Sequence, residues 1–274
     1  MTGPQLSVII ITKNNVRERN QSLLYVLQSL QRQSHQQFEI IIVDDGSTDS
    51  TTERLTDFEG EITLLKADSD GGRLGSLRNQ GARLARADTL VFLDDDTYLV
   101  DRDALSMIHD HNLEYDFMCG ARRLWSHLFW HRFVSLDWSV STTTSTLRDL
   151  AILPKGINRQ SGFRDLNEFT FIGNFGAVRR SAFDEVGGFS DNYVGLGLED
   201  TELMMRLCLK GFDHRILFDE ISVVHLNHVQ PVNTCYLDNL RRFQEIELQL
   251  GYHFHVNHFF GVYEGDGHAV LTQV

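Results

Sequence analysis

A run of three carboxylates stands directly behind a strongly apolar stretch, in the segment LVFLDDD at residues 90–96. Neighbouring carboxylates at the end of a buried strand repel one another when ionised, so a positive charge must offset them at neutral pH. Their hard oxygen atoms suit Mg²⁺ or Mn²⁺, bound so that the cation bridges a diphosphate. We therefore predict that the triplet Asp94, Asp95 and Asp96 binds a divalent cation together with the diphosphate that it bridges. A solvated acidic turn is the alternative.

A second acidic pair, Asp44 and Asp45, ends the apolar run IIIV and leads into the segment GSTDS. Ser50 and Glu53 have the spacing of a capping box, so part of this segment predicts the start of a helix. Asp45 is instead expected at the tip of the strand, where its carboxylate is placed to bind a nucleobase or a ribose, and Asp44 beside it is a further candidate for binding the nucleotide.

A third acidic motif is Glu199-Asp200, preceded by two glycines and followed by a helical pattern. Apolar side chains three, four, seven and eight residues after Asp200 place this aspartate on the inward stripe of the helix. The helix dipole favours its ionised form, so we predict Asp200 as a catalytic base, with helix capping as the alternative. Glu199 is the second catalytic candidate, although an ordinary charge pattern with Glu202 and Arg206 explains it in a lateral position.

A histidine, His225, directly follows a short apolar run and precedes His228 by three residues. A His-x-x-His pair does not by itself specify a metal, and a structural histidine is the alternative. The acidic motifs elsewhere in the chain make His225 a candidate metal ligand.

The elements that must position these residues follow from the pattern of apolar side chains. Short β-rich runs alternate with helical patterns over the first hundred residues, with strands expected at 6–12, 38–43, 62–65 and 89–93. This alternation predicts an α/β fold with a mostly parallel sheet covered on both faces. Ligands of such sheets bind at the carboxyl ends of the strands, where the polar residues of this chain stand.

Later in the chain, the regular pattern stops between about 122 and 164 and resumes from Glu168. The irregular segment contains Trp125, Trp130 and Trp138, and we expect either an aromatic platform for an acceptor molecule or ordinary core packing. Beyond it the pattern predicts helices near 200–209 and 236–250 and strands near 215–218 and 222–224.

The bulk composition excludes several classes of protein. The 274 residues are 42% apolar, which is enough for a sizeable core, and the net charge of -13 argues against non-specific nucleic-acid binding. Three cysteines without a C-x-x-C spacing indicate neither a disulfide framework nor a zinc ribbon. Without a signal-peptide pattern or a long apolar stretch, we expect a cytoplasmic protein, with attachment to a membrane surface left open.

Five motifs in order along the chain resemble one known group of enzymes, the inverting GT-A glycosyltransferases and in particular family 2. They are SVIIITKNN, IIVDDGSTDST, GGRLGSLRNQGARLARADTLVFLDDD, FGAVRRSAFDEVGGF and GLGLEDTELMMRLCLKG. The match covers about residues 6–228, and five motifs in the right order are far more specific than any one of them.

The resemblance implies roles for single residues. Thr12, Asn14 and Asp45 stand where the family contacts the nucleoside, and Arg78 stands in its Arg-Asn motif near the nucleotide. Asp94 and Asp96 take the D-x-D positions for the metal diphosphate, Asp200 that of the catalytic base, and His225 that of a late metal ligand.

The implied function is transfer of a sugar, with inversion, from a nucleotide-diphosphate donor (with UDP as the expected nucleotide) to an acceptor hydroxyl, dependent on Mn²⁺ or Mg²⁺. A saccharide, a lipid-linked molecule or another hydroxyl compound would be the acceptor. Residues 1–120 would bind the donor, 121–233 would bind the acceptor and carry catalysis, and 234–274 would form a C-terminal helix and a tail or lid. A non-catalytic sugar-binding module of the same fold and a sugar nucleotidyltransferase are the alternatives.

Overall fold

The structure, a computed structural model, describes residues 3–19, 21–67, 72–125, 168–169, 172–217, 219–226, 228, 235–250, 252–254 and 271–273. The expected Trp-rich acceptor platform lies almost wholly outside these residues, as does most of the expected tail.

A mixed sheet of seven strands forms the centre of the described fold, in the order β10-β6-β9-β4-β1-β2-β3. β1 pairs in parallel with β2 and β4, β2 pairs in parallel with β3, and β6 pairs in parallel with β10. β9 alone runs antiparallel to its neighbours, β4 and β6. The predicted mostly parallel sheet is therefore confirmed. The strands are β1 (Leu6–Thr12), β2 (Phe38–Asp44), β3 (Ile62–Lys66), β4 (Thr89–Asp94), β6 (Phe117–Cys119), β9 (Phe175–Arg179) and β10 (His214–Ile216).

Nine helices are described, and they cover both faces of this sheet. They are α1 (Asn15–Glu18), α2 (Ser22–Gln31), α3 (Thr51–Arg54), α4 (Leu74–Leu84), α5 (Ala104–His111), α8 (Arg180–Glu185), α9 (Glu199–Leu209) and α10 (Tyr236–Leu250), with a 3-10 turn at Leu55–Asp57 counted as the ninth. The α3 helix begins after Ser50, but the Ser50 side chain makes no capping hydrogen bond, so the expected capping box is not formed.

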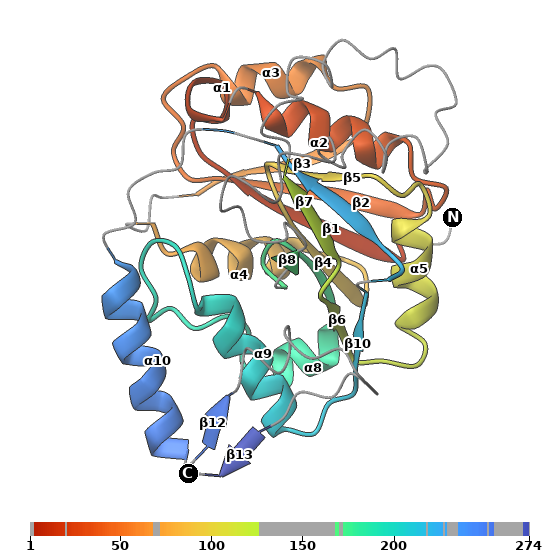
Figure 1. The fold of residues 1–274 in the computed structure, drawn as a ribbon. Coiled ribbons are helices and arrows are strands. Elements are labelled where there is room, and N and C mark those ends of the chain that lie inside the picture. Colours follow the sequence, from red (N-terminus) through yellow and green to blue (C-terminus); the bar gives the residue numbers. More distant parts are fainter. Residues whose placement is uncertain are drawn as a thin grey trace, which may run out of the picture.

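Alternate side chains of the strands enter two separate apolar cores. Val8 and Ile10 of β1 pack with side chains of α2 and α5, whereas Ile9 and Ile11 pack with those of α4, α8 and α9. Figure 1 shows the two groups of helices on opposite sides of the sheet. This burial on both sides explains why the strands are continuous apolar runs rather than alternating ones.

A second, smaller sheet in the order β5-β11-β7-β8 packs beside the central one. Its strands are β5 (Thr97–Leu99), β7 (Arg122–Trp125), β8 (Glu168–Phe169) and β11 (Ser222–His225), and β12 (Tyr252–Phe254) pairs with β13 (Leu271–Gln273) elsewhere. The two larger sheets both take strands from each side of residue 120, and the division of the chain into donor and acceptor halves stays a prediction. None of the described helices combines the length and apolar character that a bilayer-spanning helix requires.

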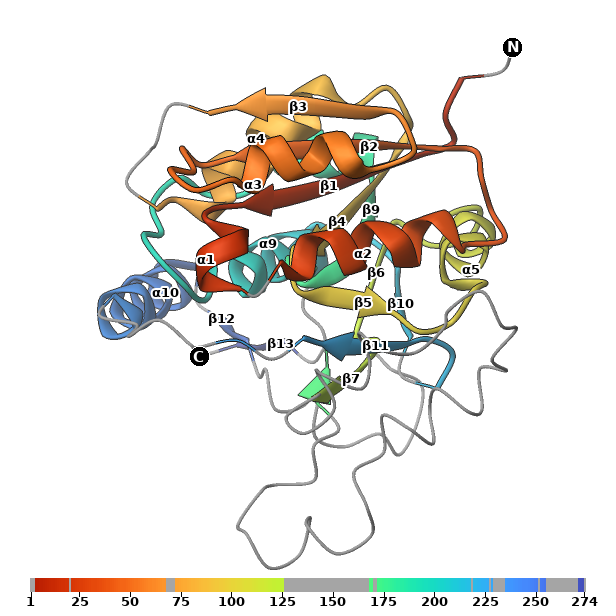
Figure 2. The ribbon, with the colours of Figure 1, turned by 90° about the horizontal axis from the view of Figure 1, so that it is seen from above.

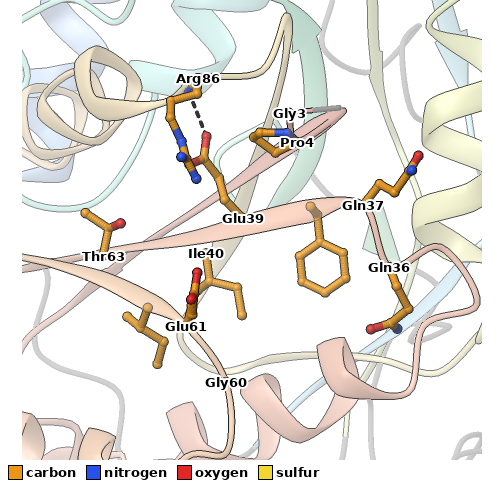
Figure 3. A pocket seen from close by; sticks show the side chains of 12 residues that line it. Gly3, Pro4, Gln36, Gln37, Glu39, Ile40, Gly60, Glu61, Thr63 and Arg86 are labelled. Carbon is orange, nitrogen blue, oxygen red and sulfur yellow. Dashed lines mark hydrogen bonds and ion pairs between the residues drawn. The ribbon is translucent and has the colours of Figure 1, made fainter. Parts of the chain in front are cut away.

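An open hollow of about 690 Å³ lies at the amino ends of β2 and β3 (Figure 3). Its half-buried carboxylate, Glu39, accepts hydrogen bonds from Ser7 Oγ at 2.6 Å and from the Arg86 backbone N–H at 2.6 Å. Its charge is balanced by the Arg86 guanidinium at 2.7 Å. Because the predicted ligand-binding residues stand at the opposite, carboxyl ends of the strands, this hollow is separate from them.

The close approach of α4 to the sheet depends on Gly81. A methyl group at this position would lie 2.5 Å from Ile9 Cγ2 and 3.2 Å from Val43 Cγ2, both in the core. We expect Gly81→Ala to lower the free energy of unfolding by about 1–3 kcal/mol because the core is overpacked, despite the higher helix propensity of alanine. Urea unfolding measures this loss, with Arg83→Ala on the exposed side of the same helix as the control. A more stable Gly81→Ala variant would show that α4 has room to move away.

Candidate active site

The predicted polar residues converge at the carboxyl edge of the central sheet. Thr12 at the end of β1 is in register with Asp44 at the end of β2, and Ile11 is in register with Asp94 at the end of β4. Figure 2 shows the arrowheads of β1 and β3 on the same side of the molecule, where α1 also lies. Parallel pairing thus brings together three segments that lie far apart in the sequence.

Asp95, the middle carboxylate of the triplet, holds the loop that follows β1. It accepts hydrogen bonds from Thr12 Oγ1 at 2.7 Å and from Asn15 Nδ2 at 2.8 Å, and its backbone carbonyl accepts one from Ser22 Oγ at 2.7 Å. Burial raises the pKa of Asp95 above its ordinary value. Thr12 and Asp95, which were both predicted to bind the nucleotide diphosphate, are therefore hydrogen-bonded to each other. Their contact with a nucleotide stays a prediction.

The next carboxylate, Asp96, lies beside two imidazoles. Its Oδ2 atom is 2.9 Å from His228 Nε2 and 3.5 Å from His225 Nε2, and all three side chains are buried. One ligand atom from each residue lies within 4.8 Å of the others. The backbone carbonyl of Asp96 accepts a hydrogen bond from Leu226 N at 2.7 Å, which ties the end of β4 to the end of β11.

The chemistry of this triad fits a divalent cation. Burial lowers the pKa of His225 to about 3, so its imidazole is neutral at physiological pH and able to ligate. Burial opposes ionisation of Asp96, but the hydrogen bond with His228 and the charge of Arg19 outweigh it and lower the pKa of this carboxyl. One ionised carboxylate and two imidazoles are ligands that Mn²⁺ and related cations accept. Asp96 and His225 were predicted as ligands from the sequence, and His228 joins them.

Arg19 was not singled out from the sequence, yet its guanidinium lies within the triad. It forms an ion pair with Asp96, its Nε atom lies 3.4 Å from Asp95 Oδ1, and its Nη1 atom lies 3.1 Å from His228 Nε2. The charges of Asp95 and Asp96 raise the pKa of Arg19, so the side chain stays positive. Nothing in the local sequence distinguishes Arg19 from Arg17, which is why only the fold could identify it.

The first carboxylate, Asp94, is held by a different set of partners. Arg78 Nη2 donates to its Oδ1 atom at 3.1 Å, and Asn174 Nδ2 donates to its Oδ2 atom at 2.6 Å. Both oxygens are thus engaged away from the triad of Asp96, His225 and His228. The metal-ligand role predicted for Asp94 stays a prediction, and Asn174 is an additional site residue that local sequence did not reveal.

Arg78 is buried and joins Asp94 to the Glu-Asp motif. Its Nη1 atom donates to Glu199 Oε1 at 2.9 Å, and its side chain is only 4% exposed. The lateral position expected for Glu199 is therefore wrong, because this carboxylate is buried against Arg78. The expected helical charge pair instead joins Glu202 to Arg206, at 2.7 Å.

Asp200 lies in the same buried group, at the first turn of α9. Positive φ angles at Gly195, Gly197 and Leu198 turn the chain into this helix. Asp200 Oδ1 accepts a hydrogen bond from the Thr201 backbone at 2.7 Å. A methyl group at Gly173 would lie 3.1 Å from Asp200 Oδ2 and 3.0 Å from the Arg78 guanidinium, so Gly173 allows the two side chains to come close together.

The ionisation of Asp200 differs from the expectation based on the helix dipole. Burial, and then the negative charge of Glu199, raise the pKa of Asp200 to about 7. These effects outweigh the positive charge of Arg78 and the hydrogen bond from Thr201. A carboxylate with a pKa close to physiological pH is well matched to accept a proton.

The loops after β1 and β2 are joined to each other. Asn14, with φ 46°, accepts a hydrogen bond from Thr48 N at 2.8 Å and donates its own N–H to Ser47 Oγ at 2.8 Å. Asp44 accepts a hydrogen bond from Ser47 N at 3.2 Å. Asn14 and Asp44, both predicted to bind the nucleotide, thus also shape the loops that surround Asp45.

The two carboxylate oxygens of Asp45 have different surroundings. Its Oδ2 atom accepts from Lys13 Nζ at 2.8 Å, whereas its buried Oδ1 atom has no hydrogen-bond partner among the described residues. A buried acceptor without a partner costs free energy, so it favours a ligand that donates an N–H or O–H group.

Comparison with known proteins identifies the class that this fold and site define. The family model described as "Glycosyl transferase family 2" matches residues 7–187, and a model described as "N-terminal domain of galactosyltransferase" matches residues 160–230. The fold is that of the GT-A glycosyltransferases, and the chain is a glycosyltransferase. It belongs to glycosyl transferase family 2.

Several relatives are similar over part or most of the chain. An uncharacterized glycosyltransferase, YfnE, of Bacillus subtilis (strain 168) is 26% identical over 85% of this chain and 67% of its own length. The validoxylamine A glucosyltransferase of Streptomyces hygroscopicus subsp. limoneus is 40% identical, over 33% of this chain and 20% of its own length.

Solved structures share the fold at low sequence identity. The mannosyltransferase PcManGT from Pyrobaculum calidifontis, in complex with GDP-Man and Mn²⁺, has a TM-score of 0.57 and 17% identity, over 90% of this chain and 63% of its own. S. aureus TarS 1-349, in complex with UDP-GlcNAc, has a TM-score of 0.60 and 17% identity, over 90% of this chain and 66% of its own. The chain thus spans less than two thirds of the length of these two solved chains.

Because the pKa of Asp200 is raised on folding, the stability of the chain should depend on pH. The folded chain binds this proton more tightly than the unfolded chain, whose pKa is near 3.8. The resulting stability is present below pH 3.8 and is lost as the pH rises towards about 7. Asn at position 200 cannot ionise, so the Asp200→Asn variant does not lose this stability. The free energy of unfolding of the variant minus that of the wild type should therefore be about 2–4 kcal/mol larger at pH 8 than at pH 4. The exposed Asp184→Asn is the control. A difference that does not change with pH would contradict the raised pKa.

Proposed function

We propose that the chain transfers a sugar from a nucleotide-diphosphate donor to an acceptor hydroxyl, with inversion and with the help of a divalent cation. The observation that carries this proposal is the adjacency of two groups at one edge of the sheet. The Asp96–His225–His228 triad has the ligands for a cation, and Arg78 joins Asp94 at the end of β4 to Glu199, the neighbour of the buried base candidate Asp200.

Asp96, His225 and His228 would hold the cation, with Asp94 as the other predicted ligand. Bound there, a divalent cation supplies positive charge to the departing diphosphate. The chain itself supplies the geometry, because Asp96 directly precedes β5 and β5 pairs with β11 in the second sheet. His225 ends β11, and His228 follows it by three residues.

Asp200 is the proposed base, with Glu199 as its charged neighbour. It would take the proton from the acceptor hydroxyl while the acceptor oxygen bonds to the anomeric carbon and the bond to the diphosphate breaks. Attack from the face opposite the leaving group inverts the configuration at that carbon. Burial and the charge of Glu199 raise the pKa of Asp200, whereas Arg78 limits that increase, and the result is a base with a pKa of about 7.

The nucleoside would lie over the ends of β1 and β2. The buried Oδ1 atom of Asp45 is the proposed acceptor for an N–H group of the base, with Thr12, Asn14 and Asp44 shaping its surroundings. UDP is the proposed nucleotide; nucleotide sugars bound to the structural neighbours, GDP-Man and UDP-GlcNAc, support a donor of this class. A saccharide, a lipid-linked compound or another hydroxyl compound is the proposed acceptor.

Removing the base should abolish transfer without abolishing donor binding. We expect Asp200→Asn to lower kcat by about 10²–10⁴-fold, because general-base catalysis is lost while the side chain keeps its shape. Radiolabelled sugar transfer from a panel of nucleotide sugars measures turnover, and UDP titration measures binding. The wild-type rate should rise with pH up to about 7, where Asp200 becomes ionised. Normal turnover by the variant would refute the base and favour the non-catalytic binding module.

The cation site can be tested without turnover. We expect Asp96→Ala to lose measurable binding of Mn²⁺ in calorimetry, since it removes the anionic ligand of the triad. Asp184→Ala, an exposed carboxylate on α8, should bind Mn²⁺ like the wild type. Equal Mn²⁺ binding by the Asp96→Ala variant would show that the cation is held elsewhere.

A further inference from the structure

Arg19 is the positive charge nearest to two buried carboxylates in the described site. The side chains of Asp95 and Asp96 are 4% and 3% exposed, whereas that of Arg19 is 26% exposed. Two adjacent buried carboxylates repel each other strongly unless a cation lies between them. Arg19, immediately after α1, supplies that charge and is the most exposed of the three side chains.

The same guanidinium uses the atoms that would bind a metal. Arg19 Nη1 donates to Asp96 Oδ2, and Nη1 lies 3.1 Å from His228 Nε2. These are two of the ligand atoms of the triad, and the third, on His225, lies 3.5 Å from Asp96 Oδ2. Mg²⁺ binds its oxygen ligands at about 2.0–2.1 Å, so a divalent cation bound to Asp96 Oδ2 would lie close to the guanidinium and repel it.

We propose that Arg19 is an internal counter-cation that competes with the divalent cation for Asp96 and His228. The proposal rests on the metal role proposed for this triad. In the metal-free chain the guanidinium of Arg19 lies against both carboxylates, in the place that a metal ion would take. Binding of the cation then requires the guanidinium to leave, which weakens the affinity for the metal alone.

Displacement of Arg19 would also expose a group suited to the donor. A guanidinium presents parallel N–H donors that match phosphate oxygens. A diphosphate that arrives with the cation would thus offer the released Arg19 a new anionic partner. The chain would therefore bind the cation more tightly in the presence of a diphosphate than alone.

The chain provides a matched control two residues away. Arg17, on α1, is 58% exposed and pairs with Glu18 at 2.8 Å rather than with the triad. Arg17→Gln and Arg19→Gln therefore remove the same charge from almost the same place in the sequence. Arg19→Lys keeps the positive charge but not the planar guanidinium.

The experiment is calorimetric titration of the chelator-treated full chain with MnCl₂ alone, without nucleotide. If the guanidinium occupies the site most of the time, its removal should tighten Mn²⁺ binding by about tenfold or more in Arg19→Gln. Arg17→Gln should match the wild type, and Arg19→Lys should bind Mn²⁺ nearly as weakly as the wild type. Circular dichroism and thermal unfolding confirm that each variant is folded, and metal-free Arg19→Gln should unfold at a lower temperature.

The sign of the affinity change separates competition from a structural role. A side chain that only supports the site would weaken Mn²⁺ binding when removed, and unchanged or weaker binding in Arg19→Gln overturns the proposal. Equal tightening in Arg19→Lys or Arg17→Gln also overturns it. Adding Asp96→Ala to Arg19→Gln should abolish the tight binding. If the Asp96→Ala variant binds Mn²⁺ as tightly as the wild type, the proposed metal site itself is wrong. That outcome is distinguishable from failure of the Arg19 inference alone.

Discussion

Asp94, Asp95 and Asp96 follow one another at the end of the central strand β4. Ionised carboxylates that are shielded from water are stable only when positive charges lie beside them. The structure divides this task between two arginines from separate segments. Arg19 lies against Asp95 and Asp96, and Arg78 lies between Asp94 and Glu199. The rest of the site is arranged around these ion pairs.

The two arginines create different environments for neighbouring carboxyl groups. Asp96, beside Arg19 and His228, has a lowered pKa and is ionised at physiological pH. Asp200, buried beside Glu199, has a pKa of about 7 despite the nearby Arg78. One carboxylate is thus suited to hold a cation and the other to accept a proton. Carboxyl groups whose environments move their pKa values apart are typical of sites that divide catalytic roles.

The fold explains how these groups come so close. Parallel pairing of β1 with β2 and β4 brings three loop segments to one edge, and the close contact at Gly81 holds α4 near the sheet on the face that carries Arg78. β9, antiparallel to β4, brings Gly173 and Asn174 to the same place. Membership of glycosyl transferase family 2 accounts for this framework.

The sequence by itself determined the strands β1 to β4 of the parallel sheet and the acidic motifs, because apolar runs and strand-end carboxylates are local patterns. It did not predict β6 or the antiparallel β9, which complete the central sheet. The carboxylates of the acidic motifs also indicated a bound cation and a catalytic base. Only the tertiary structure decided which charges meet. The pairings of Arg19 with Asp96, Asn174 with Asp94 and Glu199 with Arg78 join residues between 77 and 121 positions apart. Such contacts depend on strand order and helix packing, and the burial they produce, rather than position along a helix, sets the pKa of Asp200.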